Sequence, residues 1–296
     1  MRAPSYRPAV PPDSTSMRSL LGRTSEVRMR VRGAAVEAAW CTAHLVIYPW
    51  GLRRDRATQE SRASLRGLPP LRRGLVVGDV EAAGTPILLV HGMVDNRSVF
   101  ALLRRGLRRR GFGTVGTVNY SPFTSDVRRA ARDLAEHVEA LCSDSGYERI
   151  HVVAHSMGGL IARYYVQRLD GDERVHTLVT MGTPHGGSAV ARWVPHALAR
   201  QLRPGSDLLA ELDAPAPDCR TRFVTFWSDQ DQMILPTRHG KLLHSDLTSR
   251  NVLVSGVGHM SLPIDGRVAH EISTTLAQLD PDGRRVTAFP SRASTQ

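Results

Sequence analysis

The stretch Arg149-Ile-His-Val-Val-Ala-His-Ser156-Met-Gly-Gly-Leu160 decides how the rest of the sequence is interpreted. Its first half is rich in β-branched residues, which are typical of a buried strand, whereas residues 160–169 carry apolar side chains at helical spacing. The period changes within a few residues of Ser156, where two glycines permit a sharp turn. We therefore predict a strand, a tight turn and a helix, with the Ser156 hydroxyl lifted out of the sheet beside the amide donors of the new helix.

The residues around Ser156 follow the nucleophile-elbow spacing G-x-S-x-G, except that Ala154 replaces the first glycine. Alanine has the smallest side chain that carries a Cβ, so the turn is still permitted. On this motif alone the competing interpretation is a serine that only caps a helix. Other parts of the sequence are needed to distinguish the two interpretations.

Length and composition predict a globular protein. The chain has 296 residues, of which 41% are hydrophobic, enough for one large α/β domain with additional segments. Its three cysteines, Cys41, Cys142 and Cys219, are far apart and lack metal-ligand or C-x-x-C spacing. We expect reduced thiols rather than a disulfide framework.

The net charge of +11 is concentrated at one end of the chain. Residues 1–73 contain 14 arginines against 5 acidic residues, and the remainder is nearly balanced. Lys241 is the only lysine, a bias typical of a GC-rich bacterial genome. A nucleic-acid partner is therefore not expected.

Residues 1–73 are predicted to form a basic N-terminal extension. It comprises a disordered tail over 1–26, an amphipathic helix over about 31–47 and a linker over 53–73. No secretory signal is recognised in the first thirty residues, so we expect a cytoplasmic or peripherally membrane-associated protein. The aromatic, Arg-flanked helix either contacts an anionic membrane surface or docks on the catalytic domain.

Residues 74–282 alternate strand and helix patterns, which predicts a doubly wound, mostly parallel α/β sheet. A flexible tail is expected over 283–296. An insertion over about 189–221 carries Trp193 to Leu198 and Leu208 to Leu212, which we interpret as two short amphipathic helices. It forms either a small cap over the site or plain packing against the sheet. The predicted strands occupy residues 85–91, 114–118, 149–155, 174–181, 222–226 and 251–255.

Polar residues that could form a catalytic triad follow three of these strands. Ser156 follows the third, Asp229 and Asp231 follow the fifth, and His259 follows the last, within a Gly-Val-Gly-His turn. A serine hydroxyl needs a base to remove its proton and an acid to orient that base. Since ligands bind beyond the carboxyl ends of parallel strands, these residues are expected to meet there.

Four motifs in order resemble the α/β-hydrolase superfamily, and more narrowly the bacterial triacylglycerol lipases and esterases whose elbow begins with alanine. They are VHGM at 90–93, AHSMGG at 154–159, MGTPHGGS at 181–188 and GVGHMSLP at 256–263. The resemblance covers about residues 74–280. It implies hydrolysis of carboxylic esters, acylglycerols in particular, by Ser156, Asp231 and His259, without a cofactor.

The resemblance also implies that the backbone amides of Met93 and Met157 form the oxyanion hole. We assign Gly92 and His155, which lie beside them, to substrate binding. In the family the acid precedes apolar residues leading to a proline, as in Asp231-Gln-Met-Ile-Leu-Pro236, so Asp229 is interpreted as a turn cap.

Two alternatives remain open at this stage. An acyltransferase would use the same triad with an alcohol in place of water, and a non-catalytic hydrolase fold would only bind its ligand. No metal site is expected, because His151 and His155 flank a strand and its turn rather than share a helical face. No nucleotide-binding glycine motif is present either.

Overall fold

The computed structural model describes residues 84–92, 96–118 and 125–277 of the chain. The predicted extension over 1–73, with its helix at about 31–47, and the predicted tail over 283–296 lie outside the described residues. Met93 does so as well. Within the described ranges, no helix is long and apolar enough to cross a membrane.

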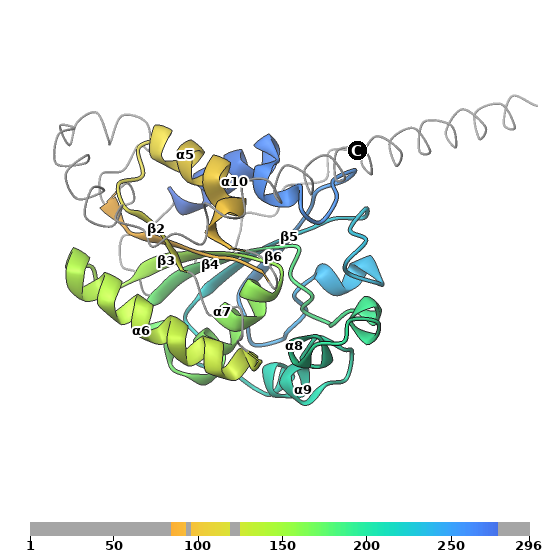
Figure 1. Ribbon diagram of the computed structural model, residues 1–296. Coiled ribbons are helices and arrows are strands. Elements are labelled where there is room, and N and C mark those ends of the chain that lie inside the picture. The colour runs from red at the N-terminus through yellow and green to blue at the C-terminus, as the bar shows by residue number, and fades with distance from the viewer. Residues whose placement is uncertain (1–83, 93–95, 119–124, 278–296) are drawn as a thin grey trace, which may run out of the picture.

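The centre of the molecule is a six-stranded sheet in the order β2-β1-β3-β4-β5-β6, and every neighbouring pair runs parallel. Helices cover both of its faces, so the predicted doubly wound parallel α/β sheet is confirmed (Figure 1). The strands are β1 (Ile87–Val90), β2 (Val115–Val118), β3 (Ile150–His155), β4 (Val175–Met181), β5 (Arg222–Trp227) and β6 (Ser249–Leu253).

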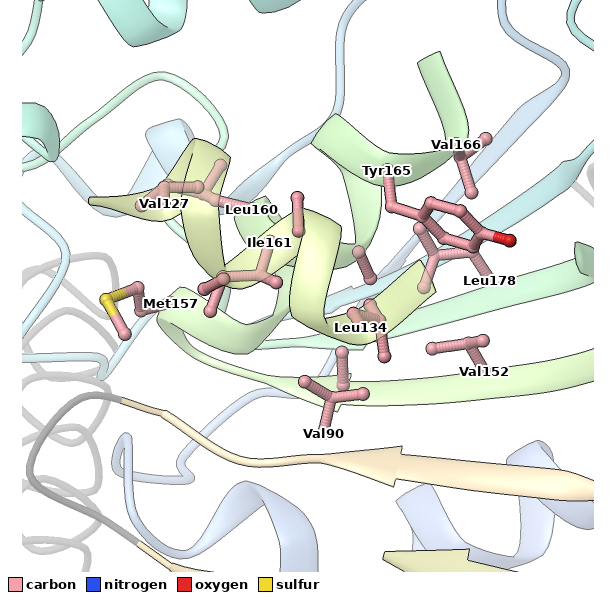
Figure 2. Close-up of a cluster of buried hydrophobic side chains, with 14 of the residues drawn as sticks. Val90, Val127, Leu134, Val152, Met157, Leu160, Ile161, Tyr165, Val166 and Leu178 are labelled. Atoms are coloured by element: carbon pink, nitrogen blue, oxygen red, sulfur yellow. The ribbon is translucent and has the colours of Figure 1, made fainter. Parts of the chain in front are cut away.

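The helices lie in two layers, one on each face of the sheet (Figure 1). α5 (Ala101–Arg109) and α10 (Gly266–Leu276) cover one face, and α6 (Val127–Ser145) and α7 (Met157–Arg168) cover the other. Alternate residues of each strand enter different cores: Val152 packs with the α6 and α7 residues, whereas Val153 packs on the α5 and α10 side. Figure 2 shows the larger core.

Polar caps fix where the long helices begin. The Asp126 carboxylate accepts from the Arg128 amide at the start of α6, and Gly146 ends that helix in the left-handed conformation. On the other face, Asn96 caps the short 3-10 helix η1 (Arg97–Phe100) that leads into α5.

The last strand lies two residues earlier than predicted, at Ser249–Leu253 instead of 251–255. Among the described strands β6 is at the edge of the sheet and pairs only with β5. Its first residues, Ser249 and Arg250, are half-buried, so an edge strand can begin in polar sequence that gives no apolar signal.

The insertion over 189–221 contains three short elements. They are the 3-10 helix η3 (Ala189–Arg192), α8 (Ala197–Gln201) and α9 (Asp207–Asp213). The expectation that Trp193 belongs to the first amphipathic helix is wrong, because its side chain is 87% exposed and α8 begins only at Ala197. Pro195 accounts for this break, since proline disfavours the helical conformation at the residue before it.

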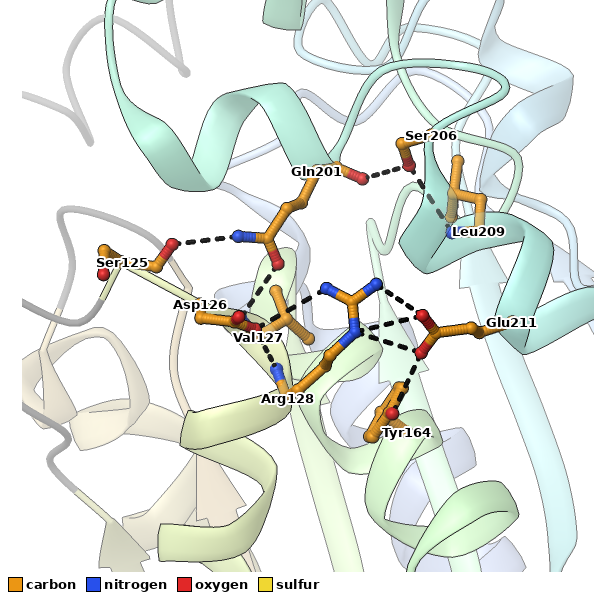
Figure 3. A network of polar contacts seen from close by, with 9 residues as sticks. All are labelled: Ser125, Asp126, Val127, Arg128, Tyr164, Gln201, Ser206, Leu209 and Glu211. Atoms are coloured by element: carbon orange, nitrogen blue, oxygen red, sulfur yellow. Dashed lines mark hydrogen bonds and ion pairs between the residues drawn. The ribbon is translucent and has the colours of Figure 1, made fainter.

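The second half of the insertion is fastened to α6 and α7 by a set of polar contacts that we call the α9 clasp, formed by Arg128, Tyr164, Gln201 and Glu211 (Figure 3). Arg128 Nη2 donates to Glu211 Oε1 at 2.6 Å, and the Tyr164 hydroxyl donates to Glu211 Oε2 at 2.9 Å. Gln201 accepts from the Val127 amide at 3.0 Å, so α8 is held at the same corner.

A second arginine under α9 is almost completely buried. Arg163 of α7 is 1% exposed, and its Nη2 donates to the Leu212 carbonyl at 2.9 Å and to Asp213 Oδ1 at 3.3 Å. Burial lowers its pKa to about 10, so the guanidinium stays charged at neutral pH. Gln167 also donates to the Leu212 carbonyl, at 3.1 Å. The C-terminal end of α9 is therefore held by side chains from a core helix.

Candidate active site

Ser156 lies at the turn between β3 and α7, where the sequence places the elbow. Its φ of 55° and ψ of −129° are unusual for a residue with a Cβ, and such strain costs on the order of 1–3 kcal/mol. The surrounding structure holds it, because the Ser156 amide donates to the Met181 carbonyl at 2.9 Å. The strain lifts the hydroxyl above the carboxyl end of the sheet.

The two glycines after the serine are required by close packing. A Cβ on Gly158 would lie 2.4 Å from the His91 carbonyl oxygen, and one on Gly159 would lie 2.0 Å from Thr183 Oγ1. Any side chain there would push the start of α7 away from β1 and β4. The glycines thus set the position of the helix N-terminus beneath Ser156.

His259 bridges Ser156 and Asp231 in one chain of hydrogen bonds. Its Nε2 lies 3.0 Å from Ser156 Oγ, and its Nδ1 lies 2.8 Å from Asp231 Oδ2. Because an ionised carboxylate only accepts, Nδ1 carries the ring hydrogen and Nε2 is free to accept the serine proton. His259 is 5% exposed and Asp231 2% exposed, so the chain is largely shielded from water.

The acid in this series of hydrogen bonds is Asp231. Its second oxygen, Oδ1, accepts from the amides of Met233 and Ile234 at 2.9 and 3.0 Å, which fixes the carboxylate. Asp229 instead accepts from the Gly256 amide at 3.0 Å and caps the turn before His259. The structure therefore brings Ser156, Asp231 and His259 together and leaves Asp229 outside.

His155 lies behind the triad. Its ring is 1% exposed, its Nε2 donates to the His259 carbonyl at 3.1 Å, and its ring centre is 4.9 Å from that of His259. The substrate-binding role expected from the sequence does not match this position, because the ring is buried against the base. His155 restrains the loop that carries His259.

Of the two expected oxyanion donors, Met157 belongs to the described residues and Met93 does not. Met157 is the first residue of α7, so its amide has no acceptor within the helix and is available to a ligand. Met93 is outside the described residues, but Gly92 before it is buried close to the serine. A Cβ on Gly92 would lie 2.9 Å from Ser156 Cβ. Gly92 therefore provides room for the serine.

Two residues that the sequence analysis did not single out also support the site. Thr183 donates its hydroxyl to the Ser156 carbonyl at 2.9 Å. Gly182 has a φ of +54°, and a Cβ there would lie 3.1 Å from His259 Nδ1. Both belong to the MGTPHGGS motif at 181–188, which can be recognised in the sequence. Their contacts with Ser156 and His259 depend on the fold.

No group of three or more His, Cys, Asp or Glu side chains that could hold a metal occurs in the part of the chain that the structure describes. His151, considered earlier with His155, instead packs edge-on against His176. Burial lowers the pKa of His151 well below its usual value, with a further contribution from His176. It is a neutral core histidine.

A family model described as the alpha/beta hydrolase fold matches residues 85–203, which include β1, the elbow and the MGTPHGGS turn. The described part of the chain therefore has the α/β-hydrolase fold. Its sheet order and the position of Ser156 after β3 agree with that match. Solved structures share this fold: the chain superposes on Aspergillus fumigatus lipase B with a TM-score of 0.60 and 15% identity, covering 71% of this chain and 55% of that one.

Curated relatives share part of the sequence. A triacylglycerol lipase of Burkholderia plantarii is 30% identical over 132 residues, which cover 42% of this chain and 36% of the lipase. The lysosomal thioesterase PPT2-B of Xenopus laevis is 21% identical over 195 residues, covering 60% of this chain and 64% of the thioesterase. The chain thus spans less than two thirds of the length of either relative.

Proposed function

We propose that this protein is a serine hydrolase that cleaves carboxylic esters of lipids through an acyl-enzyme on Ser156. One observation carries the proposal: the chain of hydrogen bonds from Asp231 through His259 to Ser156, with distances of 2.8 and 3.0 Å. Relatives named as a lipase and a thioesterase support acyl transfer as the reaction class. The intact triad disfavours a hydrolase fold that only binds its ligand.

In the first half of the reaction Ser156 Oγ attacks the ester carbonyl while His259 Nε2 takes the hydroxyl proton. The Asp231 carboxylate stabilises the resulting imidazolium and holds its orientation. Negative charge on the former carbonyl oxygen is stabilised by backbone amides, those of Met157 and Met93 in this proposal. The C–O bond to the alcohol then breaks, and the alcohol leaves with the proton from His259.

In the second half a water molecule replaces the alcohol. It gives a proton to His259 Nε2 as it attacks the acyl-enzyme, and the carboxylic acid departs when the proton returns to Ser156. An acyltransferase would run the same steps with a second alcohol. Analysis of the products in the presence of added glycerol separates the two reactions, because only transfer yields a new ester.

The test is turnover of p-nitrophenyl esters of graded chain length by the wild type and Ser156→Ala. Loss of the nucleophile lowers the rate by about four orders of magnitude or more. Ser245→Ala is the matched control, because that exposed serine bonds only to the neighbouring Asp246 carboxylate. Near-normal turnover by Ser156→Ala, with the fold intact by circular dichroism, would refute the proposal.

A further inference from the structure

Two loops beside the triad are joined into one surface. The Ala189 amide donates to the Leu235 carbonyl at 2.9 Å, and Ser188 Oγ donates to the Met233 carbonyl at 2.8 Å. α8 packs against η3 and extends the same surface. We call this surface the loop patch and define it by its outward side chains, Arg192, Trp193, Arg200, Met233, Leu235 and Arg238.

The loop patch exposes large apolar side chains. Trp193 is 87% exposed, Met233 48% and Leu235 44%. A single exposed apolar residue is ordinary, but three on joined loops form a patch of the kind that contacts a partner or a membrane. Tryptophan in particular is enriched where an apolar phase meets water, because its ring is apolar and its N–H is polar.

The charge on the loop patch is entirely positive. Residues 189–206 and 232–245 contain no aspartate or glutamate. Arg192, Arg200 and Arg238 are exposed, and none of the three has an ion-pair partner among the residues that the structure describes. Several other arginines are compensated, as in the pairs of Arg128 with Glu211, Arg174 with Glu139 and Arg250 with Glu271.

Both loops also connect to the triad. Asp231 lies two residues before Met233 and accepts its amide. On the other loop, Thr183 bonds to the Ser156 carbonyl five residues before Ser188. A surface that contacts the loop patch would therefore be close to the loops that carry the reacting groups.

We propose that the loop patch docks the enzyme on an anionic lipid–water interface, with Trp193 inserted among the headgroups and the three arginines against anionic phosphates. This proposal rests on the proposed function, because docking would serve the hydrolysis of lipid esters. Charge complementarity favours an anionic surface over a neutral one. Docking through this face delivers ester groups to the carboxyl end of the sheet. Salt weakens the attraction, because exposed charges are screened.

The molecule offers a matched control surface on α5, which covers the sheet face opposite α6 and α7 (Figure 1). α5 also combines exposed arginines, Arg105 and Arg109, with an exposed leucine, Leu102, which is 53% exposed. Substitutions there remove the same charge and an exposed, although smaller, apolar side chain without touching the triad loops. They separate docking through one face from general attraction of a basic protein.

The experiment is co-sedimentation of the full-length protein with phosphatidylcholine vesicles, with and without phosphatidylglycerol, at low and high NaCl. Arg192→Gln/Arg238→Gln is compared with Arg105→Gln/Arg109→Gln, and Trp193→Ser with Leu102→Ser. Each arginine near an anionic surface contributes roughly fivefold to affinity, so the patch variant should bind at least tenfold more weakly while the α5 variant changes little.

Turnover makes the result specific. The patch variants should keep the wild-type rate on a dissolved p-nitrophenyl ester and lose rate on an ester embedded in anionic vesicles. Unchanged vesicle binding in the patch variants overturns the proposal. Vesicle binding would then be due to α5 or the N-terminal extension, and the patch would be left for a protein partner. Equal losses in the patch and α5 variants overturn it too. Weaker vesicle binding without any ester turnover would uphold docking and reject the proposed function instead.

Discussion

The triad and the α9 clasp are both chains of acidic and basic groups, but they are built for different purposes. In the triad an imidazole stands between a carboxylate and a hydroxyl, so the hydroxyl proton can move to the imidazole. In the clasp Arg128 and Glu211 are both fully charged: their hydrogen bond raises the pKa of the arginine and lowers that of the glutamate. No proton can move between them near neutral pH, so the clasp can only hold α9 in place.

This difference predicts that substitutions in the triad lower turnover, whereas substitutions in the clasp lower stability. The largest effect is expected on turnover. Asp231→Asn should lower kcat by about three to four orders of magnitude, because the amide no longer stabilises the imidazolium. Asp229→Asn, the matched control two residues away, should stay within a few-fold. Arg128→Gln in the clasp should also leave kcat near the wild-type value. The assignment would be reversed if Asp229→Asn were the inactive variant.

A steric change beside the serine sharpens the same comparison. Gly92→Ala adds a Cβ that would lie 2.9 Å from Ser156 Cβ, so the serine or the β1 loop must shift. A displacement of about 1 Å in an active site can cost on the order of a hundredfold in rate, and we expect a loss of this size in kcat. Gly266→Ala, where nothing lies within 4 Å of the added Cβ, is the control. Equal kcat values in the two variants would mean that the Gly92 loop does not restrain the serine.

Substitutions under α9 should act on stability instead. Arg163→Met removes two donors from the end of α9 and leaves the Leu212 carbonyl with fewer partners, at a cost of about 1–3 kcal/mol in the free energy of unfolding. Arg128→Gln should cost less, under about 1 kcal/mol, because that pair is partly exposed to water. Denaturant titration measures both. A large loss of kcat in folded Arg163→Met would show that α9 takes part in the reaction.

At neutral pH no effect is expected from the last comparison, which concerns the pH dependence of stability. His151 is neutral when buried but binds a proton in the unfolded chain, so stability is complete above about pH 6.5 and falls below it, by up to about 1.4 kcal/mol per pH unit. His151→Phe should flatten this acid slope, and the exposed His270→Phe should not. Identical slopes for wild type and His151→Phe would locate the acid sensitivity elsewhere, His185 being the next buried candidate.

The features predicted well from sequence are those with a local cause. Continuous apolar runs marked the buried strands, and the polar residues Ser156, Asp231 and His259 that follow three of them are the ones that the fold brings into hydrogen-bond contact. β6 was misplaced because an edge strand tolerates polar residues, and Trp193 because spacing was given more weight than Pro195.

Contacts between distant segments gave no signal in the sequence. The bond from His155 to the His259 carbonyl joins residues 104 positions apart, and the pair of Arg128 with Glu211 joins residues 83 apart. Nothing near either residue in the sequence indicates its partner. Such contacts follow from the sheet order and helix packing, and they become visible only once the fold is known.

Covalent labelling with a fluorophosphonate, followed by peptide mass spectrometry, tests the central claim most directly, because only an activated serine attacks the phosphorus. We predict one adduct per chain, on Ser156, formed rapidly by the wild type, slowly or not at all by His259→Ala, and at the normal rate by Arg128→Gln. An adduct on another serine, or wild-type labelling of Ser156 in His259→Ala, would contradict the claim that His259 activates Ser156.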